Sequence, residues 1–235
     1  MALPFFYVEN IQAVGEVFQL NEETSKHMVQ VLRMNAGTMV SLTDGKGKKA
    51  NAEVVDAHKK KCSVLVKEVM VLPSPDKKTA IAISLVKNTS RFEWFLEKAA
   101  ELGITTVYPL LCERTEKLHF RTDRMKGILV SAMLQSQQVW LTEIHKPTSF
   151  ADLIHTQTFR SKYIAYCGEE YPRNALHQEQ TVLETLVLIG PEGDFTTSEV
   201  KQAIERGFQP VTLGNNRLRT ETAGVAAAVV LGLWN

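Results

Sequence analysis

The chain has 235 residues, which is long for one compact domain and comfortable for two. A hydrophobic content of 44% and a charged content of 23% are those of a globular protein and exclude a disordered or fibrous chain. Because 27 Lys and Arg face 26 Asp and Glu, the net charge is +1, and contact with a polyanion must come from local patches.

The cysteines and the ends of the chain indicate a cellular compartment. Cys62, Cys112 and Cys167 lie far apart and the histidines are scattered, so we expect neither a disulfide framework nor a metal site. Residues 1–4 show no signal peptide, and the most apolar stretch, residues 223–234, is shorter than the roughly 20 residues of a membrane span. We therefore expect a soluble, cytoplasmic protein with no membrane partner.

A connector is predicted at residues 73–78, where two prolines and several charges resist both helix and central strand. Residues 1–72 form the first predicted domain, and residues 79–235 form the second.

The first domain has a mostly β pattern. The Asp44-Gly45 dipeptide between two strand-like runs predicts a hairpin, because glycine supplies the positive φ of a tight turn. We expect a small antiparallel barrel or curved sheet with one short helix at residues 22–32. Its strands are predicted at residues 5–8, 17–20, 39–43, 52–57 and 62–71.

Strands and helices alternate in the second domain, which predicts an α/β fold with a mostly parallel sheet covered on both faces. Ser90 with Glu93 and Thr196 with Glu199 have the spacing of capping boxes that open helices, and Thr222 is expected to cap the last helix. Strands are predicted at residues 80–86, 105–111, 163–166, 185–189 and 211–213, and a further helix at residues 123–138.

Parallel sheets bind ligands at the carboxyl ends of their strands, and two loops there are unusual. The glycine turn, residues 190–193, has the sequence Gly-Pro-Glu-Gly, in which two glycines let the backbone approach a ligand closely. On its own, such a turn is more often a structural connection. Neither this loop nor the next has a dinucleotide or phosphate-loop motif, and no serine hydrolase elbow is present.

The arginine turn, residues 213–222, joins a strand to an apolar helix. A solvated loop would explain its asparagines and threonines, but Arg219 and Glu221 stand directly before a buried helix, where charges need partners. A binding role is therefore as well supported as a solvated loop.

Together these residues resemble the signature of the SPOUT methyltransferases, and most closely that of the bacterial 16S ribosomal RNA (uracil-N3) methyltransferases. The resemblance rests on the glycine turn, Leu213-Gly214 and the string Leu-Arg-Thr-Glu-Thr-Ala at residues 218–223. It covers nearly the whole chain. Further matching positions are Leu32-Arg33-Met34, Asp44-Gly45-Lys46-Gly47, Lys87, Glu93-Trp94, Lys98, Glu101-Leu102-Gly103, Pro109 and Glu113-Arg114.

The chain departs from that family's pattern in three places. Asp194 stands where the family often has glycine, and Asn216-Arg217 stand where it has Arg-Ile. Residues 134–138 read Leu-Gln-Ser-Gln-Gln in place of Glu-Gln-Ser-Gly-Arg.

The resemblance implies a SPOUT-type α/β domain with a trefoil knot, preceded by a PUA-like RNA-binding β-barrel. It implies that S-adenosylmethionine binds in the knot and that the protein is a homodimer, which suits an apolar last helix that must be buried. The cofactor residues that it implies are Ile189, Gly190, Pro191, Glu192, Gly193, Leu213, Gly214, Leu218 and Thr220.

The implied reaction is methylation of uracil N3, which becomes a nucleophile only when its proton leaves. Arg219 is the candidate to stabilise the charge on the uracil oxygens, and Glu221 either orients Arg219 or accepts the proton. The implied partner is 16S ribosomal RNA or the small ribosomal subunit. The candidate RNA-binding residues are Arg33, Lys46, Lys48, Lys49, Lys87 and Arg91, although charge alone also fits a solvated hairpin.

Three other functions stay open. The protein could be a non-catalytic RNA-binding or assembly protein, which binding of S-adenosylmethionine would exclude. It could be a SPOUT enzyme for another ribosomal or transfer RNA position, which the altered residues 137–138 leave open. It could methylate a small molecule, although an RNA-binding barrel would then be hard to explain.

Overall fold

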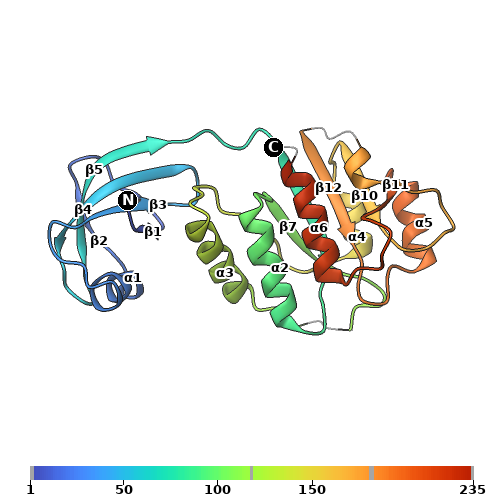
Figure 1. The fold of residues 1–235 in the computed structure, drawn as a ribbon, viewed down its shortest axis with the longest axis horizontal. Helices are drawn as coiled ribbons and strands as arrows, with labels where there is room; N and C mark the ends of the chain where they lie inside the picture. Colours follow the sequence, from blue (N-terminus) through green and yellow to red (C-terminus); the bar gives the residue numbers. More distant parts are fainter. Residues whose placement is uncertain (1–2, 117–118, 180–182, 234–235) are drawn as a thin grey trace. The chain divides into compact units, whose positions relative to one another are not determined.

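The computed structural model describes residues 3–116, 119–179 and 183–233 (Figure 1). The chain forms two compact units, of which the first contains Met1–Ser74 together with Met133–Leu141. The second contains Pro75–Ala132 and Thr142–Asn235. The first passage between units falls inside the predicted connector, and the chain then enters the first unit a second time.

The first unit is built on a curved five-stranded sheet in its described part. Only the β1–β3 pair is parallel, and the other pairs are antiparallel. Alternate side chains such as Leu42, Ala52 and Val64 are fully buried and form a core that also takes up Met28 from the helical segment. The strands lie in the order β1 (Phe5–Tyr7), β3 (Met39–Thr43), β4 (Lys48–Asp56), β5 (Ser63–Val71) and β2 (Val17–Gln19), and α1 (Glu22–Lys26) continues into the π-helix η1 (His27–Val31).

The β3–β4 hairpin is closed by the segment that returns to this unit. Asp44 Oδ1 accepts hydrogen bonds from Lys46 N at 2.8 Å and Lys48 N at 3.1 Å, which fixes the turn. Gly47, at φ +92°, donates its N–H to Val139 O at 2.9 Å. A Cβ on Gly47 would lie 2.3 Å from the Trp140 ring, so the turn requires glycine.

The second unit is a parallel sheet between two layers of helices, as predicted. Among its described residues every strand pair is parallel. The order is β11 (Asn174–Ala175), β13 (Gln209–Thr212), β10 (Ser161–Ala165), β12 (Glu184–Ile189), β6 (Lys78–Ser84), β7 (Thr106–Leu111) and β8 (Glu143–Ile144), with β9 (Thr148–Ser149) beside β7.

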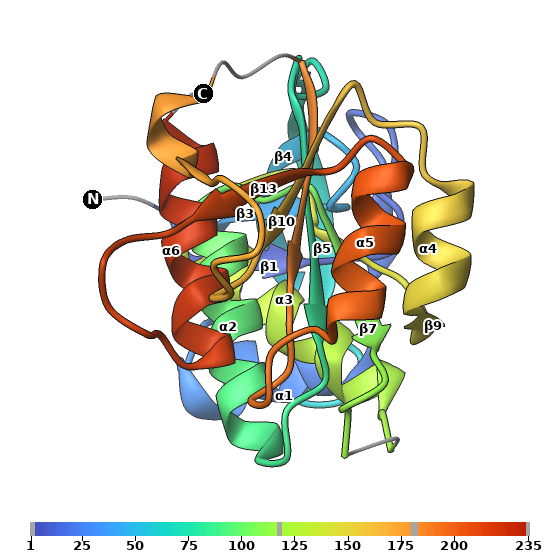
Figure 2. The same cartoon turned by 90° about the vertical axis from the view of Figure 1, so that its right-hand side faces the viewer.

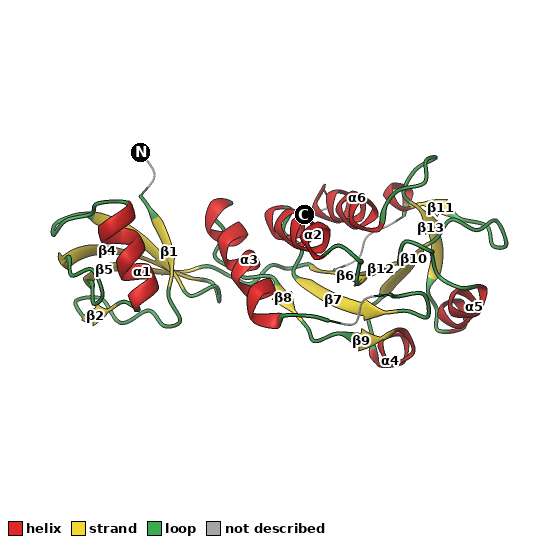
Figure 3. Ribbon diagram, turned by 90° about the horizontal axis from the view of Figure 1, so that it is seen from below, coloured by secondary structure: helices red, strands yellow, loops and turns green. Residues whose placement is uncertain are grey.

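Helices cover both faces of this sheet (Figures 2 and 3). On one face lie α2 (Thr89–Glu101) and α6 (Thr220–Leu233), which pack on each other, and α6 also packs on β6. On the other face lie α4 (Phe150–Thr156) and α5 (Thr197–Glu205), over a core that includes Leu188, Phe195 and Val200. The chain therefore crosses from β13, near one edge, back to the middle of the sheet before it ends. Two further helical segments are α3 (Thr122–Gln135) and the 3-10 turn η2 (Leu176–Gln178).

The helix starts give one confirmed prediction and two corrections. The Thr196–Glu199 capping box is present at the start of α5. The predicted Ser90 cap is wrong, because Asn88 caps α2 and its Oδ1 accepts from Ser90 N at 3.0 Å. The predicted Thr222 cap is also wrong, because α6 begins two residues earlier, at Thr220.

Candidate functional site

The two loops singled out in the sequence leave the sheet at the same edge. Strand β10 lies between β12 and β13, and Ala165 pairs with Ile189 on one side and Val211 on the other. Because all three strands are parallel, the loops that follow them emerge side by side. The glycine turn and the arginine turn therefore both flank the loop after β10 (Figure 2).

A pocket of about 450 Å³ opens at this edge, which is a volume typical of small-molecule sites. The predicted cofactor residues Leu213, Gly214 and Leu218 line it. The remaining lining residues are Ala165, Tyr166, Cys167, Glu169, Arg173, Val211, Thr212, Asn215, Asn216, Arg217 and Ala223. The loop after β10 thus supplies a wall that the sequence analysis missed.

The other predicted site residues lie next to the pocket and not in its wall. Among the described residues, the lining includes neither the glycine turn with Ile189 nor Arg219, Thr220 and Glu221. Ile189, Gly190 and Pro191 are buried, whereas Glu192 and Gly193 are exposed.

Asp194 joins the glycine turn to the pocket. Its Oδ2 accepts a hydrogen bond from Cys167 N at 2.8 Å, and its Oδ1 accepts from Phe195 N at 2.8 Å. Asp194 has φ +62°, a left-handed conformation that is unfavourable for a residue with a Cβ. The two hydrogen bonds compensate for this conformation, and the one from Cys167 N holds the loop after β10 in place.

The far side of the glycine turn is held by the loops after β6 and β7. Arg114 Nη1 donates to Gly193 O at 2.6 Å, and Lys87 N donates to Glu192 Oε1 at 3.1 Å. A Cβ on Gly190 would lie 3.1 Å from the Phe195 ring, so this glycine serves close packing of the turn. The glycine turn is therefore held in place by the loops after β6 and β7 on one side and, through Asp194, contacts the loop after β10 on the other.

The arginine turn is open at Gly214. Gly214 has φ +142°, and a Cβ there would meet no atom within 4 Å. Thr212 Oγ1 donates to Gly214 O at 2.8 Å, which bends the chain back at the end of β13. The backbone of Gly214 is consequently accessible to a ligand.

Arg219 and Glu221 lie at the start of α6, and Arg91 of α2 pairs with Glu221. Arg219 is exposed, and its carbonyl accepts the first helical hydrogen bond from Ala223 N at 2.8 Å. The Glu221 side chain is only 9% exposed, and its Oε1 lies 3.6 Å from Arg91 Nε on α2. Arg91, expected to contact RNA, is therefore the ion-pair partner of Glu221.

Thr220 carries a buried hydroxyl with no hydrogen-bond partner among the described residues. An unsatisfied buried polar group is costly, and this one lies next to the pocket without lining it. The apolar side chains of Leu213 and Leu218 and the exposed turn at Gly214 suit the nucleoside part of a ligand.

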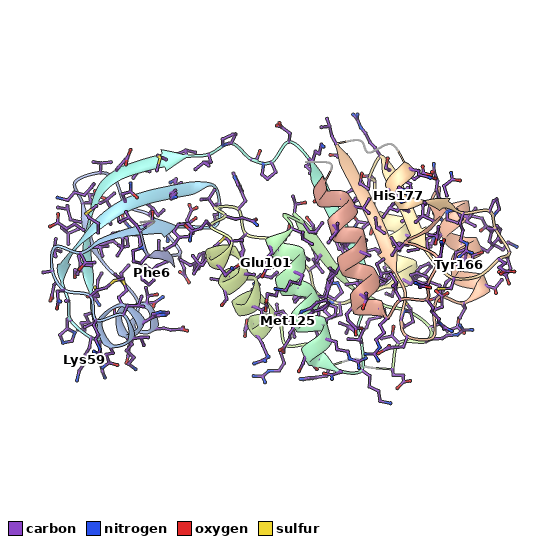
Figure 4. All side chains as sticks on the ribbon, viewed as in Figure 1. Phe6, Lys59, Glu101, Met125, Tyr166 and His177 are labelled. Carbon is purple, nitrogen blue, oxygen red and sulfur yellow. The ribbon has the colours of Figure 1, made fainter. Side chains whose placement is uncertain are left out.

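The remaining pocket wall is cationic and contains a thiol. Arg173 lies 5.5 Å from the ring of Tyr166, which Figure 4 labels, and donates through Nη1 to Tyr166 O at 2.8 Å. Burial raises the pKa of the Cys167 thiol and the Asp194 carboxylate raises it further, although Arg217 and Arg173 oppose the change. The thiol is therefore protonated near neutral pH and is a poor nucleophile.

The predicted RNA-binding residues fall into two groups. In the first unit, Arg33, Lys46 and Lys48 are exposed, and Lys49 Nζ lies 5.3 Å from the ring of Phe5. In the second unit both cations have acidic partners, since Lys87 Nζ lies 3.1 Å from Glu116 Oε2 and Arg91 pairs with Glu221. The positive charges on the hairpin of the first unit are therefore less neutralised by acidic partners than the two cations of the second unit.

In the part of the chain that the structure describes, no cluster of His, Cys, Asp and Glu side chains is arranged to hold a metal ion. No helix among these residues has the length and apolarity needed to cross a membrane.

Comparison with known proteins matches both units. A model of the RNA methyltransferase domain matches residues 73–232, and a model of the RNA methyltransferase PUA domain matches residues 20–67. A Synechocystis protein named ribosomal RNA small subunit methyltransferase E is 31% identical over 224 residues, which are 92% of this chain and 73% of that protein.

Solved structures agree over the full length. A probable rRNA methyltransferase from Porphyromonas gingivalis is 35% identical with a TM-score of 0.88, over 99% of this chain and 96% of that one. A ribosomal RNA small subunit methyltransferase E from Neisseria gonorrhoeae, bound to S-adenosyl methionine, is 26% identical with a TM-score of 0.87, over 99% and 98%. The expected fold class, an α/β methyltransferase domain with a small PUA-like β domain, is confirmed. The chain belongs to the RNA methyltransferase family.

Proposed function

We propose that the protein transfers the methyl group of S-adenosylmethionine to N3 of a uridine in 16S ribosomal RNA. The observation that carries the proposal is the pocket at the ends of β10 and β13, with the glycine turn fixed beside it. Family membership supports an RNA methyltransferase, and relatives matched over most of their length are named for the small ribosomal subunit.

The pocket has the chemistry that S-adenosylmethionine requires. Leu213 and Leu218 would cover its apolar parts, and the exposed carbonyl of Gly214 would accept a hydrogen bond besides the one from Thr212. Thr220, whose buried hydroxyl has no partner among the described residues, lies next to the pocket and not in its wall. We assign Ile189, Gly190, Pro191, Glu192 and Gly193 to the adjoining support, which acts on the pocket through Asp194.

When bound, the cofactor supplies an electrophilic methyl group, and the chain has to position and activate the uracil. Loss of the N3 proton leaves negative charge on the two uracil carbonyl oxygens, which a fixed cation stabilises. Arg219 is exposed at the start of α6, directly after the pocket residue Leu218. We assign Arg219 to this contact with the uracil.

We assign Glu221 and Arg91 to positioning. The carboxylate lies in the first turn of α6, where the helix dipole favours negative charge, and the guanidinium of Arg91 lies 3.6 Å away. Because Glu221 is nearly buried and pairs with Arg91, we assign it the role of a fixed anion that orients this arginine.

The first unit would anchor the RNA. Lys46, Lys48 and Lys49 lie on one hairpin whose turn is fixed by Asp44, and ammonium groups on a fixed hairpin bind phosphates without reading sequence. The proposed partner is 16S ribosomal RNA within the small ribosomal subunit, and the proposed location is the cytoplasm, where that RNA is found.

A second copy of the chain would complete the enzyme. Trp94 on α2 is 44% exposed and Val229 on α6 is 39% exposed, and these two helices pack on each other. Large apolar side chains at the surface of a helix pair are typical of an interface. We propose a homodimer that covers them.

Methyl transfer by the purified protein tests the proposal. Small ribosomal subunits from cells that lack the gene are incubated with S-adenosylmethionine, and the RNA is digested to nucleosides and analysed by mass spectrometry. Appearance of 3-methyluridine supports the proposal. Methylation of another nucleoside would show a different target position, and absence of both methylation and cofactor binding would indicate a non-catalytic RNA-binding protein.

A further inference from the structure

The helical segment of the first unit ends in an exposed tip that its core does not use. Val31 at the end of η1 is 68% exposed and Leu32 is 45% exposed, and Arg33 follows them at the surface. The next residue, Met34, is buried in the core. We call residues 31–33 the apolar–basic tip.

The backbone of the tip is fixed in an unfavourable conformation. Arg33 has φ +54°, in the left-handed region where glycine is the usual residue after a helix. Leu32 N donates to His27 O and Met34 N donates to Met28 O, both at 3.0 Å, so the chain on either side is held. Glycine would adopt this backbone conformation at a lower free-energy cost than arginine. The presence of arginine at this position therefore suggests that its side chain has a function.

Arg33 is the charged residue of the tip, and the nearest charged residue before it in the chain is also basic. Residues 24–43 contain Lys26 and Arg33 and no Asp or Glu. Lys26 pairs with Glu22 at 2.7 Å, whereas the guanidinium of Arg33 makes no hydrogen bond or ion pair among the described residues. A free guanidinium beside two exposed aliphatic side chains is complementary to a phosphate beside an unstacked base.

We propose that the apolar–basic tip binds an unpaired segment of the substrate RNA, with Arg33 on a phosphate and Val31 and Leu32 against the face of a base. The inference rests on the proposed function. It identifies a second RNA contact of the first unit, besides the hairpin that carries Lys46, Lys48 and Lys49. An unpaired segment is required, because base faces are accessible only where the bases are not stacked in a duplex.

The substitution Arg33→Gly tests the tip without damaging the fold. Glycine adopts positive φ freely, so the variant should melt at the same temperature as the parent or higher. It should raise KM for small ribosomal subunits about tenfold, leave kcat and the Kd for S-adenosylmethionine unchanged, and lower the salt dependence of RNA binding by about one ion.

Gln137→Gly is the matched control. Gln137 has φ +59°, so this change also removes a side chain from a left-handed position. It should leave KM for the subunits unchanged. A second variant, Leu32→Ser, should weaken binding of polyuridylate and not of an RNA duplex of equal length.

Unchanged RNA binding by Arg33→Gly would overturn the inference. A change only in the concentration dependence of dimer formation would show instead that the tip contacts a second copy of the chain. The proposed function is judged separately: if the parent binds polyuridylate through Arg33 but forms no 3-methyluridine, the tip stands and the proposed activity fails.

Discussion

Two residues that depart from the resembled family occupy the same kind of backbone position. Asp194 and Gln137 stand where that family carries glycine, and both have positive φ, +62° and +59°. At both positions a glycine, which adopts positive φ freely, is therefore replaced by a residue whose positive φ needs stabilising contacts. For Asp194 the compensation is visible, because its carboxylate accepts from Cys167 N and Phe195 N.

Asp194→Gly separates the backbone requirement from the hydrogen bonds. Glycine suits the positive φ, so the melting temperature should change little, but the loop after β10 loses its tie to the glycine turn. We expect the affinity for S-adenosylmethionine, measured by calorimetric titration, to fall roughly tenfold. Asp194→Asn keeps an acceptor oxygen and should therefore lower the affinity for S-adenosylmethionine by less than Asp194→Gly. Parental affinity in the glycine variant would show that the tie does not shape the pocket.

Arg219→Ala tests the proposed stabilisation of the uracil anion. Arg219 follows the pocket residue Leu218 but does not line the pocket, so cofactor affinity should stay near the parental value. The kcat for methyl transfer should fall by about 10²–10³, the loss typical of a removed transition-state contact. Near-parental turnover would remove Arg219 from the reaction.

At the scale of elements, Gly47 shows how a hairpin depends on a distant segment. A Cβ on Gly47 would lie 2.3 Å from the Trp140 ring and 2.8 Å from Leu72 O, at φ +92°. Gly47→Ala should therefore lower the free energy of unfolding by about 3 kcal/mol or more, measured by denaturant titration.

Gly37→Ala is the control for Gly47→Ala. Gly37 has a similar φ of +86°, but a Cβ there would meet no atom within 4 Å. Gly37→Ala should lower the free energy of unfolding by about 1 kcal/mol, which is the cost of placing a residue with a Cβ at positive φ. Equal effects of the two substitutions would mean that Trp140 does not pack against the hairpin.

Local patterns predicted the elements whose signals are themselves local. The Thr196–Glu199 box is confirmed because both reciprocal hydrogen bonds form. The Ser90–Glu93 box fails because Asn88 lies earlier in the chain, and because the Glu93 carboxylate instead pairs with Arg124, whose Nη2 lies 2.7 Å away. Side-chain competition of this kind cannot be read from spacing.

Short elements and the third wall of the pocket also escaped the sequence analysis. Helix α4 and the two-residue strands β8, β9 and β11 are too short for hydrophobic periodicity to reveal. The loop after β10 has no recognisable motif. The signal that could have pointed to it is the charged residues Glu169 and Arg173, which lie in the loop after a partly buried strand.

At the scale of the whole molecule, the chain path is what the sequence could not reveal. The segment Met133–Leu141, which begins in the last turn of α3, belongs to the first unit, and α6 returns from β13 to pack on α2 and β6. Both arrangements depend on contacts between residues far apart in the chain. Only the family resemblance, which implies a knot, indicated a non-local path of this kind.

The juxtaposition of the two turns is likewise non-local, and the account of function depends on it. The glycine turn and the arginine turn leave the two parallel strands on either side of β10, and both lie at the pocket, which is where a methyl donor and a uracil have to meet. The central claim is therefore that this edge of the sheet methylates uracil N3 in ribosomal RNA.

Mass-spectrometric mapping of 16S ribosomal RNA in cells tests that claim most directly. Cells without the gene should lack one 3-methyluridine, the parental gene should restore it, and a gene carrying Arg219→Ala should not. An unchanged 3-methyluridine content in cells without the gene would contradict the account.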